Sequence, residues 1–282
     1  MSVALPHPTL YQSRVATRAG GSSFYLAMRI LPREQRQAMF EIYSFCREVD
    51  DIADGDQPRE WRLARLARWR EAIAGLYAGR APGELAGLAR AVERFSLRQT
   101  DFLAVIDGME MDVDADIRAP SLERLDLYCD RVACAVGRLS VRVFGMADRE
   151  GEALAHHLGR ALQLTNILRD LDEDAAVGRL YLPLEALQSA GIESSDPAAV
   201  LASPSLSAAC ACVAARAREH FIEAGKIMAR SARRVVRAPR IMAAAYERLL
   251  EDMLARGWSA PRRRVRLNKA HLLWAALRYA FP

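Results

Sequence analysis

Apolar residues recur along this chain at spacings of three and four positions, which is the period of an amphipathic α-helix. In the segment 59–78, for example, Leu66, Trp69 and Ile73 fall on one helical face. Gly and Pro cluster between the periodic runs and mark where helices end. The pattern predicts helices over about 33–54, 59–78, 83–95, 99–115, 121–137, 149–174, 205–232 and 239–256, a further basic helix after Pro261, and a surface connection at 191–204.

Composition agrees with an all-helical chain. The 282 residues are 51% hydrophobic, which is enough for a sizeable core. Ala, Leu, Arg and Glu dominate while β-branched residues are sparse, and that mixture favours helix. No repeat of fixed period is visible, and residues 1–19 are expected to form a flexible arm ahead of the helical part.

The cysteines and the N-terminal residues indicate the cellular compartment in which the protein is expected. Cys46, Cys129, Cys134, Cys210 and Cys212 are odd in number and match no zinc spacing, so we expect reduced thiols in a cytoplasmic protein. The first ten residues lack a charged start followed by an apolar core, so no signal peptide is expected. No apolar run approaches the roughly 20 residues that a membrane span needs. The chain is therefore expected to be soluble or peripheral to a membrane.

The whole chain has a net charge of +5, and a cluster of basic residues lies near the C-terminus. An apolar stretch follows this cluster at 272–281. It is interpreted as a solvated helix start, a nucleic-acid patch or a surface that contacts anionic lipid at the inner membrane. Aromatic residues are not interleaved with the basic ones, which argues against nucleic acid. The cluster consists of Arg262, Arg263, Arg264, Arg266 and Lys269.

One polar stripe lies in the segment 163–174, which contains no Gly or Pro. On a helix, Asn166, Asp170 and Asp174 would share a face, with Gln163 three positions ahead of them. Like charges four positions apart cost an isolated helix a few tenths of a kcal/mol. The stripe is interpreted either as a solvated acidic face or as part of a site for a divalent cation.

A second acidic motif changes the balance between those two interpretations. At the end of the predicted helix 33–54, Tyr43, Arg47, Asp50 or Asp51, and Asp54 recur at spacings of three and four. Several carboxylates that face one cavity would repel each other strongly in a low dielectric. Mg²⁺ resolves such repulsion, because it prefers carboxylate, water and phosphate oxygens.

Basic residues beside both motifs favour a phosphorylated substrate. Arg47, Arg169 and Arg179 are placed to clamp a polyanion. No nucleophile elbow or Walker loop is present, and the adjacent His156 and His157 would point to different sides of a helix, so neither is expected to bind a metal. The chemistry that remains is ionisation of a diphosphate, with apolar walls that shelter a carbocation. Acidic residues in 99–115 point in several directions, and most are expected to be solvated.

Five blocks of the chain, in order, resemble the squalene/phytoene synthase family of head-to-head prenyl synthases. The most specific is Asn166-Ile167-Leu168-Arg169-Asp170 with a downstream Glu-Asp. The resemblance extends over nearly the whole chain and implies one all-α isoprenoid synthase domain, a helical bundle with a central active-site cavity, over residues 20–282. The blocks are 22–24, 43–54, 128–137, 163–174 and 179–183.

The resemblance also implies roles for individual residues. Asp50, Asp51, Asp54, Asp170 and Asp174, with Asn166, would hold Mg²⁺, or Mn²⁺ in its place, on two diphosphates. Tyr128 would assist proton removal or steer the cation. The residues expected to bind substrate are Ser23, Phe24, Tyr43, Arg47, Gln163, Asn166, Arg169, Tyr246 and Arg264.

Within the family, the phrases at 22–29, 45–54 and 178–183 are most similar to the bacterial branch that serves hopanoid synthesis. That likeness implies condensation of two farnesyl diphosphates to presqualene diphosphate without NADPH, with prenyl diphosphates and downstream pathway enzymes as partners and no nucleic acid. The alternatives are 15-cis-phytoene synthesis from two geranylgeranyl diphosphates, squalene synthesis with NADPH, and a non-catalytic assembly factor, which intact acidic motifs disfavour. A head-to-tail prenyltransferase or terpene cyclase is disfavoured by the Tyr128 block.

Overall fold

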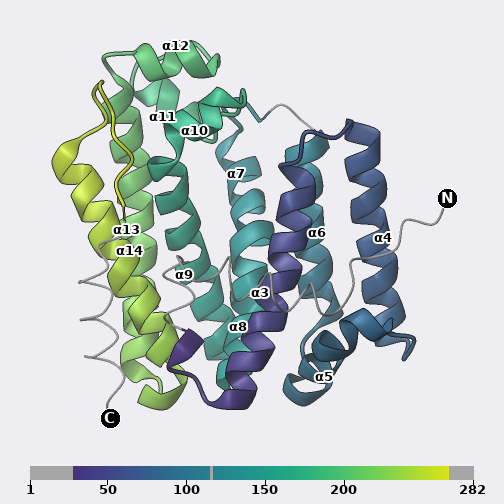
Figure 1. Ribbon diagram of the computed structural model, residues 1–282. Coiled ribbons are helices and arrows are strands. Elements are labelled where there is room, and N and C mark those ends of the chain that lie inside the picture. The colour runs from purple at the N-terminus through teal and green to yellow at the C-terminus, as the bar shows by residue number, and fades with distance from the viewer. Residues whose placement is uncertain (1–27, 115–116, 267–282) are drawn as a thin grey trace.

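The computed structural model describes residues 28–114 and 117–266, and within them the chain is all-helical (Figure 1). The part of the chain described contains no β-strand, only one isolated bridge between Arg118 and Leu180. Among these residues, no helix is both long and apolar enough to cross a membrane. The predicted arm 1–19, Ser23 and Phe24, Lys269 and the apolar stretch 272–281 all lie outside the described residues.

The observed helices follow the predicted ones closely. The long helices run roughly along one direction, and the short α10, α11 and α12 gather at one end of the bundle (Figure 1). The elements are α3 Arg33–Ala53, α4 Arg59–Tyr77, η1 Gly83–Leu85, α5 Ala86–Phe95, α6 Gln99–Asp114, α7 Leu122–Cys129, η2 Asp130–Cys134, α8 Ala135–Phe144, α9 Asp148–Arg169, α10 Leu171–Ala176, α11 Leu184–Ser189, α12 Pro197–Ala202, α13 Leu206–Arg230, η3 Arg233–Val235 and α14 Arg237–Arg256.

Two predictions about connections are wrong. The segment 191–204 is not only surface connection, because it contains α12, whose Val200 and Leu201 are buried. The Asp196 side chain caps this helix by accepting from the backbone N–H of Ala199 at 2.9 Å. Residues 262–266 are not helical, so no basic helix begins directly after Pro261.

The acidic stripe lies on two helices instead of the single helix predicted. α9 ends at Arg169 and α10 begins at Leu171, with Asp170 between them at φ −101° and ψ 17°. The backbone bonds nevertheless continue through the break: Asp170 N–H donates to Asn166 O at 2.9 Å, and Asp174 N–H donates to Asp170 O at 2.8 Å. Asn166, Asp170 and Asp174 therefore remain about one turn apart.

The predicted helix 121–137 is continuous to Phe144 but contains the π-helical segment η2. Such wide turns are frequent at functional sites. The small residues around it permit close helix contact: a Cβ added at Gly137 would lie 3.0 Å from the Ala155 side chain on α9. At Gly159 an added Cβ would lie 2.8 Å from the Cys134 backbone. α9 is thus held tightly against η2 and α8.

The core consists of two clusters of buried side chains. One comes mainly from α3–α6 and α8, the other from α7, α9 and α13, and α14 contributes to both. Val132, Leu162 and Tyr246 are partly buried and pack against both clusters. These three residues also line a large cavity, so the cavity lies at the seam between the two halves of the core.

Candidate active site

The cavity has a volume of about 1140 Å³, and its charged lining residues are grouped toward one end. They come from the C-terminal parts of α3 and α9, which both end on the side of the bundle where α10 lies (Figure 1), and from Arg264 and Arg266. The rest of the wall is mainly apolar. On α3, the lining residue Met39 precedes Asp50 by eleven positions, or about 16 Å at the helical rise. The cavity can therefore hold a long apolar chain with an anionic head group at its polar end.

The first acidic group is on α3. Arg47 donates to Asp50 Oδ2 at 2.6 Å and to Asp51 Oδ1 at 3.2 Å, and all three side chains line the cavity. Burial raises the pKa of Asp50 to about 6; Arg47 opposes that shift and the nearby Asp54 adds to it. The carboxylates of this group outnumber its one arginine, Arg47, so excess negative charge remains.

The second acidic group lies at the junction of α9 and α10. Arg169 Nε donates to Asp170 Oδ1 at 2.7 Å, and Arg264 Nη2 donates to the same oxygen at 2.7 Å. Burial raises the pKa of Asp174 to about 7, and the adjacent Asp170 carboxylate raises it further. Arg264 also pairs with Glu173 at 3.3 Å. Part of the C-terminal basic cluster thus faces the site.

Arg179 joins the two acidic groups. Its Nη1 donates to Asp54 Oδ1 at 2.8 Å, across 125 positions of sequence. Its charge also lowers the pKa values of Asp50 and Asp174, against the burial that raises them. Arg179 comes from the loop after α10, so the turn at the end of the second motif brings a cation to the first.

A buried cluster that the sequence did not predict is centred on Asp112 of α6. The hydroxyls of Tyr181 and Tyr128 donate to its carboxylate at 2.7 and 3.1 Å, and the two rings stack with centroids 5.0 Å apart. Burial raises the pKa of Asp112 to about 6, although the Tyr181 hydrogen bond opposes the shift. Asp112 was among the acids expected to be solvated, and that expectation is wrong. It is also wrong for Asp101, which is buried and paired with Arg138 at 2.6 Å.

The structure brings most of the predicted site residues together. Asp54, Asp170 and Asp174 do not line the cavity itself: they lie just beyond its polar lining, where Arg179, Arg169 and Arg264 connect Asp54 and Asp170 to the site. The predicted residues that line the cavity are Tyr43, Arg47, Asp50, Asp51, Tyr128, Gln163, Asn166, Arg169, Tyr246 and Arg264.

The donor set suits a hard divalent cation. Asn166 Oδ1 is buried at the cavity wall and has no hydrogen-bond partner within the described part of the chain. Asp50 and Asp51 line the same cavity, and Asp170 follows Asn166 by four positions; carboxylate and carbonyl oxygens suit Mg²⁺. The raised pKa values of Asp50 and Asp174 show carboxylates that a cation would stabilise in their charged form.

A cavity of this kind within a helical bundle defines the class of all-helical isoprenoid synthases. The sequence model described as squalene/phytoene synthase matches residues 17–271. The chain belongs to the squalene/phytoene synthase family.

Individual relatives show which members of the family this chain is similar to. A presqualene diphosphate synthase of Rhodopseudomonas palustris is 57% identical over 277 residues, which cover 98% of each chain. One from Sinorhizobium fredii is 58% identical over 260 residues, covering 92% of this chain and 93% of its own. A chloroplastic phytoene synthase of Zea mays is 39% identical over 64% of this chain and 43% of its own. The crystal structure of squalene synthase HpnC from Alicyclobacillus acidocaldarius superposes with a TM-score of 0.79 at 27% identity, over 89% of this chain and 94% of that one.

Proposed function

We propose that this protein condenses two farnesyl diphosphates head-to-head to presqualene diphosphate, releasing one diphosphate, in squalene or hopanoid synthesis. The observation that carries the proposal is the meeting of two carboxylate groups and their arginines at one end of a single apolar cavity. The farnesyl substrate is supported by full-length relatives named presqualene diphosphate synthase at 57–58% identity.

The proposed cation is Mg²⁺, or Mn²⁺ in its place. Asp50, Asp51 and Asp54 would hold it on one side, and Asp170 and Asp174 with Asn166 on the other. A divalent ion at this end neutralises the diphosphate leaving group and so lowers the barrier to ionisation. The unpaired Asn166 oxygen and the surplus of carboxylates support this assignment.

The arginines and polar side chains bind the diphosphates. Arg47, Arg169 and Arg264 each contact a carboxylate now, and on substrate binding they turn to phosphate oxygens, which accept paired guanidinium donors well. Ionisation breaks the carbon–oxygen bond at C1 of one farnesyl diphosphate. The double bond of the second substrate supplies the electron pair that forms a bond to the C1 cation, and the diphosphate of this second substrate is retained. Gln163 adds polar contacts, and Ser23 and Phe24 are proposed to cover one diphosphate.

Tyr128 is proposed to act at the carbocation. Loss of a proton closes the cyclopropane ring, and an oxygen lone pair close to the cation can accept that proton or stabilise the charge. Tyr128 lines the cavity, and its hydroxyl donates its proton to Asp112, so the oxygen lone pairs are not used in that bond. Tyr43 and Tyr246 line the same cavity and would enclose the chain.

A second candidate substrate is geranylgeranyl diphosphate, which would make the product 15-cis-phytoene. The lower identity and shorter overlap with the phytoene synthase of Zea mays favour the farnesyl substrate. The test is incubation of the purified protein with Mg²⁺ and each diphosphate in turn, followed by product analysis. Presqualene diphosphate from the shorter substrate is expected. Phytoene from the longer one, with no product from farnesyl diphosphate, would contradict the proposal.

The location is proposed to be cytoplasmic, with peripheral contact at the inner membrane through the basic C-terminal region. Within the described residues, Arg264 pairs with Asp170 and so serves the acidic end of the site first, whereas Arg262 pairs with Asp172, which is not a proposed metal ligand. Arg263 is exposed and remains available to anionic lipid. Downstream enzymes of the pathway would receive the product there.

A further inference from the structure

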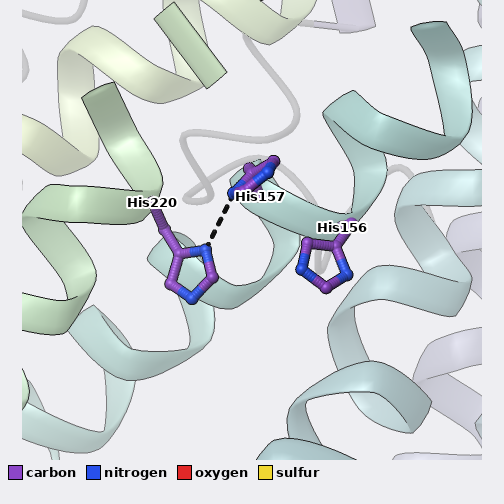
Figure 2. Close-up of side chains that lie close together, drawn as sticks. All are labelled: His156, His157 and His220. Carbon is purple, nitrogen blue, oxygen red and sulfur yellow. Dashed lines mark hydrogen bonds between the residues drawn. The ribbon is translucent and has the colours of Figure 1, made fainter. Parts of the chain in front are cut away.

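Three histidines lie together on a face outside the proposed active site, where α9 packs against α13 (Figure 2). His156 and His157 come from α9, and His220 comes from α13, 63 positions later in sequence than His157. The two adjacent histidines were expected to point to different sides of the helix, and their ring centroids lie 4.8 Å apart. One ring nitrogen from each of the three residues lies within 4.8 Å of the others.

The closest pair of ring nitrogens already has the spacing of metal ligands. His157 Nδ1 and His220 Nδ1 are 3.1 Å apart, and Figure 2 shows them facing each other. Two ligands on a tetrahedral Zn²⁺, with bonds of about 2.0–2.1 Å, are separated by roughly 3.4 Å. The exposed His156 ring is 4.8 Å from that of His157 and 5.9 Å from that of His220 between centroids, and it would have to turn toward this pair to bind the same ion.

The surroundings suit neutral imidazoles, the form that binds a metal. His157 and His220 are partly buried where α9 meets α13. Arg160 donates to His156 Nδ1 at 2.8 Å, but its positive charge is compensated by Asp126 at 3.3 Å. Glu223, one turn after His220, lies near His157, and its carboxylate pairs with Lys226 at 2.6 Å.

We propose that His157, His220 and His156 bind one first-row transition-metal ion, such as Zn²⁺, with water in the remaining position. Imidazole nitrogens suit Zn²⁺, Cu²⁺ and Ni²⁺, whereas Mg²⁺ prefers oxygen, so this site is chemically separate from the carboxylate end of the cavity. The ion would join α9 to α13. α9 carries Gln163, Asn166 and Arg169, so a metal here would also stabilise the helix that supports the active site.

The test uses metal-stripped, tag-free full-length protein in excess Mg²⁺, titrated with Co²⁺ while its visible absorption is recorded. We expect one tetrahedral Co²⁺ per chain, displaced by Zn²⁺, and a rise in melting temperature on adding Zn²⁺. Substituting His157→Gln or His220→Gln should weaken binding by at least about 10- to 100-fold, the scale seen even for outer-shell partners, and should remove the thermal shift. Circular dichroism of the Gln variants checks that they fold.

Two matched controls separate this site from others. The double variant His7→Gln/His271→Gln removes the remaining histidines, and Asp50→Asn/Asp170→Asn removes carboxylates of the proposed active site. Both should keep the Co²⁺ spectrum. A spectrum that survives in folded His157→Gln and His220→Gln, or one lost in either control, would overturn the proposal. Failure here leaves the prenyl-transfer proposal unchanged, because that proposal is measured by product formation with Mg²⁺.

Discussion

The guanidinium of Arg179 donates to Asp54 Oδ1 at 2.8 Å and so connects two acidic motifs that are 125 positions apart. Asp54 follows directly after α3, and Arg179 follows the turn after α10. Arg179 also acts electrostatically on Asp112, the residue that holds Tyr128. The positively charged Arg179 side chain therefore lies among the carboxylates of both motifs and the tyrosine cluster. A diphosphate bound there would contact it.

Removing the positive charge of Arg179 should impair catalysis more than folding. We expect Arg179→Gln to lower kcat/KM for farnesyl diphosphate by about 10²-fold, the scale of losing one preorganised donor at developing negative charge. Steady-state kinetics would measure it. Arg124→Gln, which changes an exposed arginine on α7, is the matched control and should keep kcat/KM. Equal losses in both variants would count against a specific role for Arg179.

The metal assignment predicts a sharp loss on neutralising one carboxylate of either motif. Asp54→Asn and Asp170→Asn should abolish Mg²⁺-dependent turnover while leaving the far-ultraviolet circular dichroism unchanged, because both residues lie at helix ends and outside the core. Asp172→Asn is the control and should keep turnover, since Asp172 pairs with Arg262 and is not one of the proposed metal ligands. Near-normal turnover in either test variant would refute the assignment.

The tyrosine cluster predicts an effect on product formation. Asp112→Asn removes one of the two acceptor oxygens that hold Tyr181 and Tyr128, and we expect turnover to fall roughly 10²-fold, as for loss of a positioned acid–base group. Tyr181→Phe keeps the Tyr128 bond to Asp112 and should have a smaller effect. Mass spectrometry of the products would measure both. A larger loss of turnover in Tyr181→Phe than in Asp112→Asn would contradict the role given to Asp112 as the residue that positions Tyr128.

The acidic site should cost stability when no cation is bound. Burial, with the neighbouring Asp170, raises the pKa of Asp174 to about 7 in the folded protein, whereas an unfolded Asp titrates near 3.9. The folded state therefore binds more protons between about pH 4 and 7, and this contribution to stability is lost as pH rises through that range. In EDTA, Asp174→Asn should melt above the unmodified protein at pH 8, with the difference shrinking toward pH 4.

Thermal denaturation at both pH values checks this expectation. Asp56→Asn, an exposed carboxylate in the loop after α3, is the control and should show no such pH-dependent gain. A gain for Asp174→Asn that is equal at pH 4 and pH 8 would mean that its cause is not ionisation of the carboxyl.

The helices could be predicted because their apolar period is a local property of sequence. α12 was missed because it has six residues, too few to show a period, although Asp196-Pro197 is a recognisable cap and first turn. The break at Asp170 was missed for a different reason. Nothing in the sequence from 163 to 174 interrupts a helix, and the pairing of Asp170 with Arg169 and Arg264 depends on the folded chain.

Site residues were predictable where their spacing carried the signal, as with Asp50 and Asp54. Asp112 has no such spacing, and its burial depends on Tyr128 and Tyr181, which come from other parts of the fold. The histidine cluster has the same origin. His220 meets His157 only because α9 and α13 pack side by side, and no local pattern announces that contact.

The central claim is tested most directly by incubating the protein with labelled farnesyl diphosphate and Mg²⁺, with and without NADPH, and identifying the product. We expect presqualene diphosphate in both reactions, in equal amounts and with release of one diphosphate per product. No product without NADPH, with squalene formed only in its presence, would contradict it.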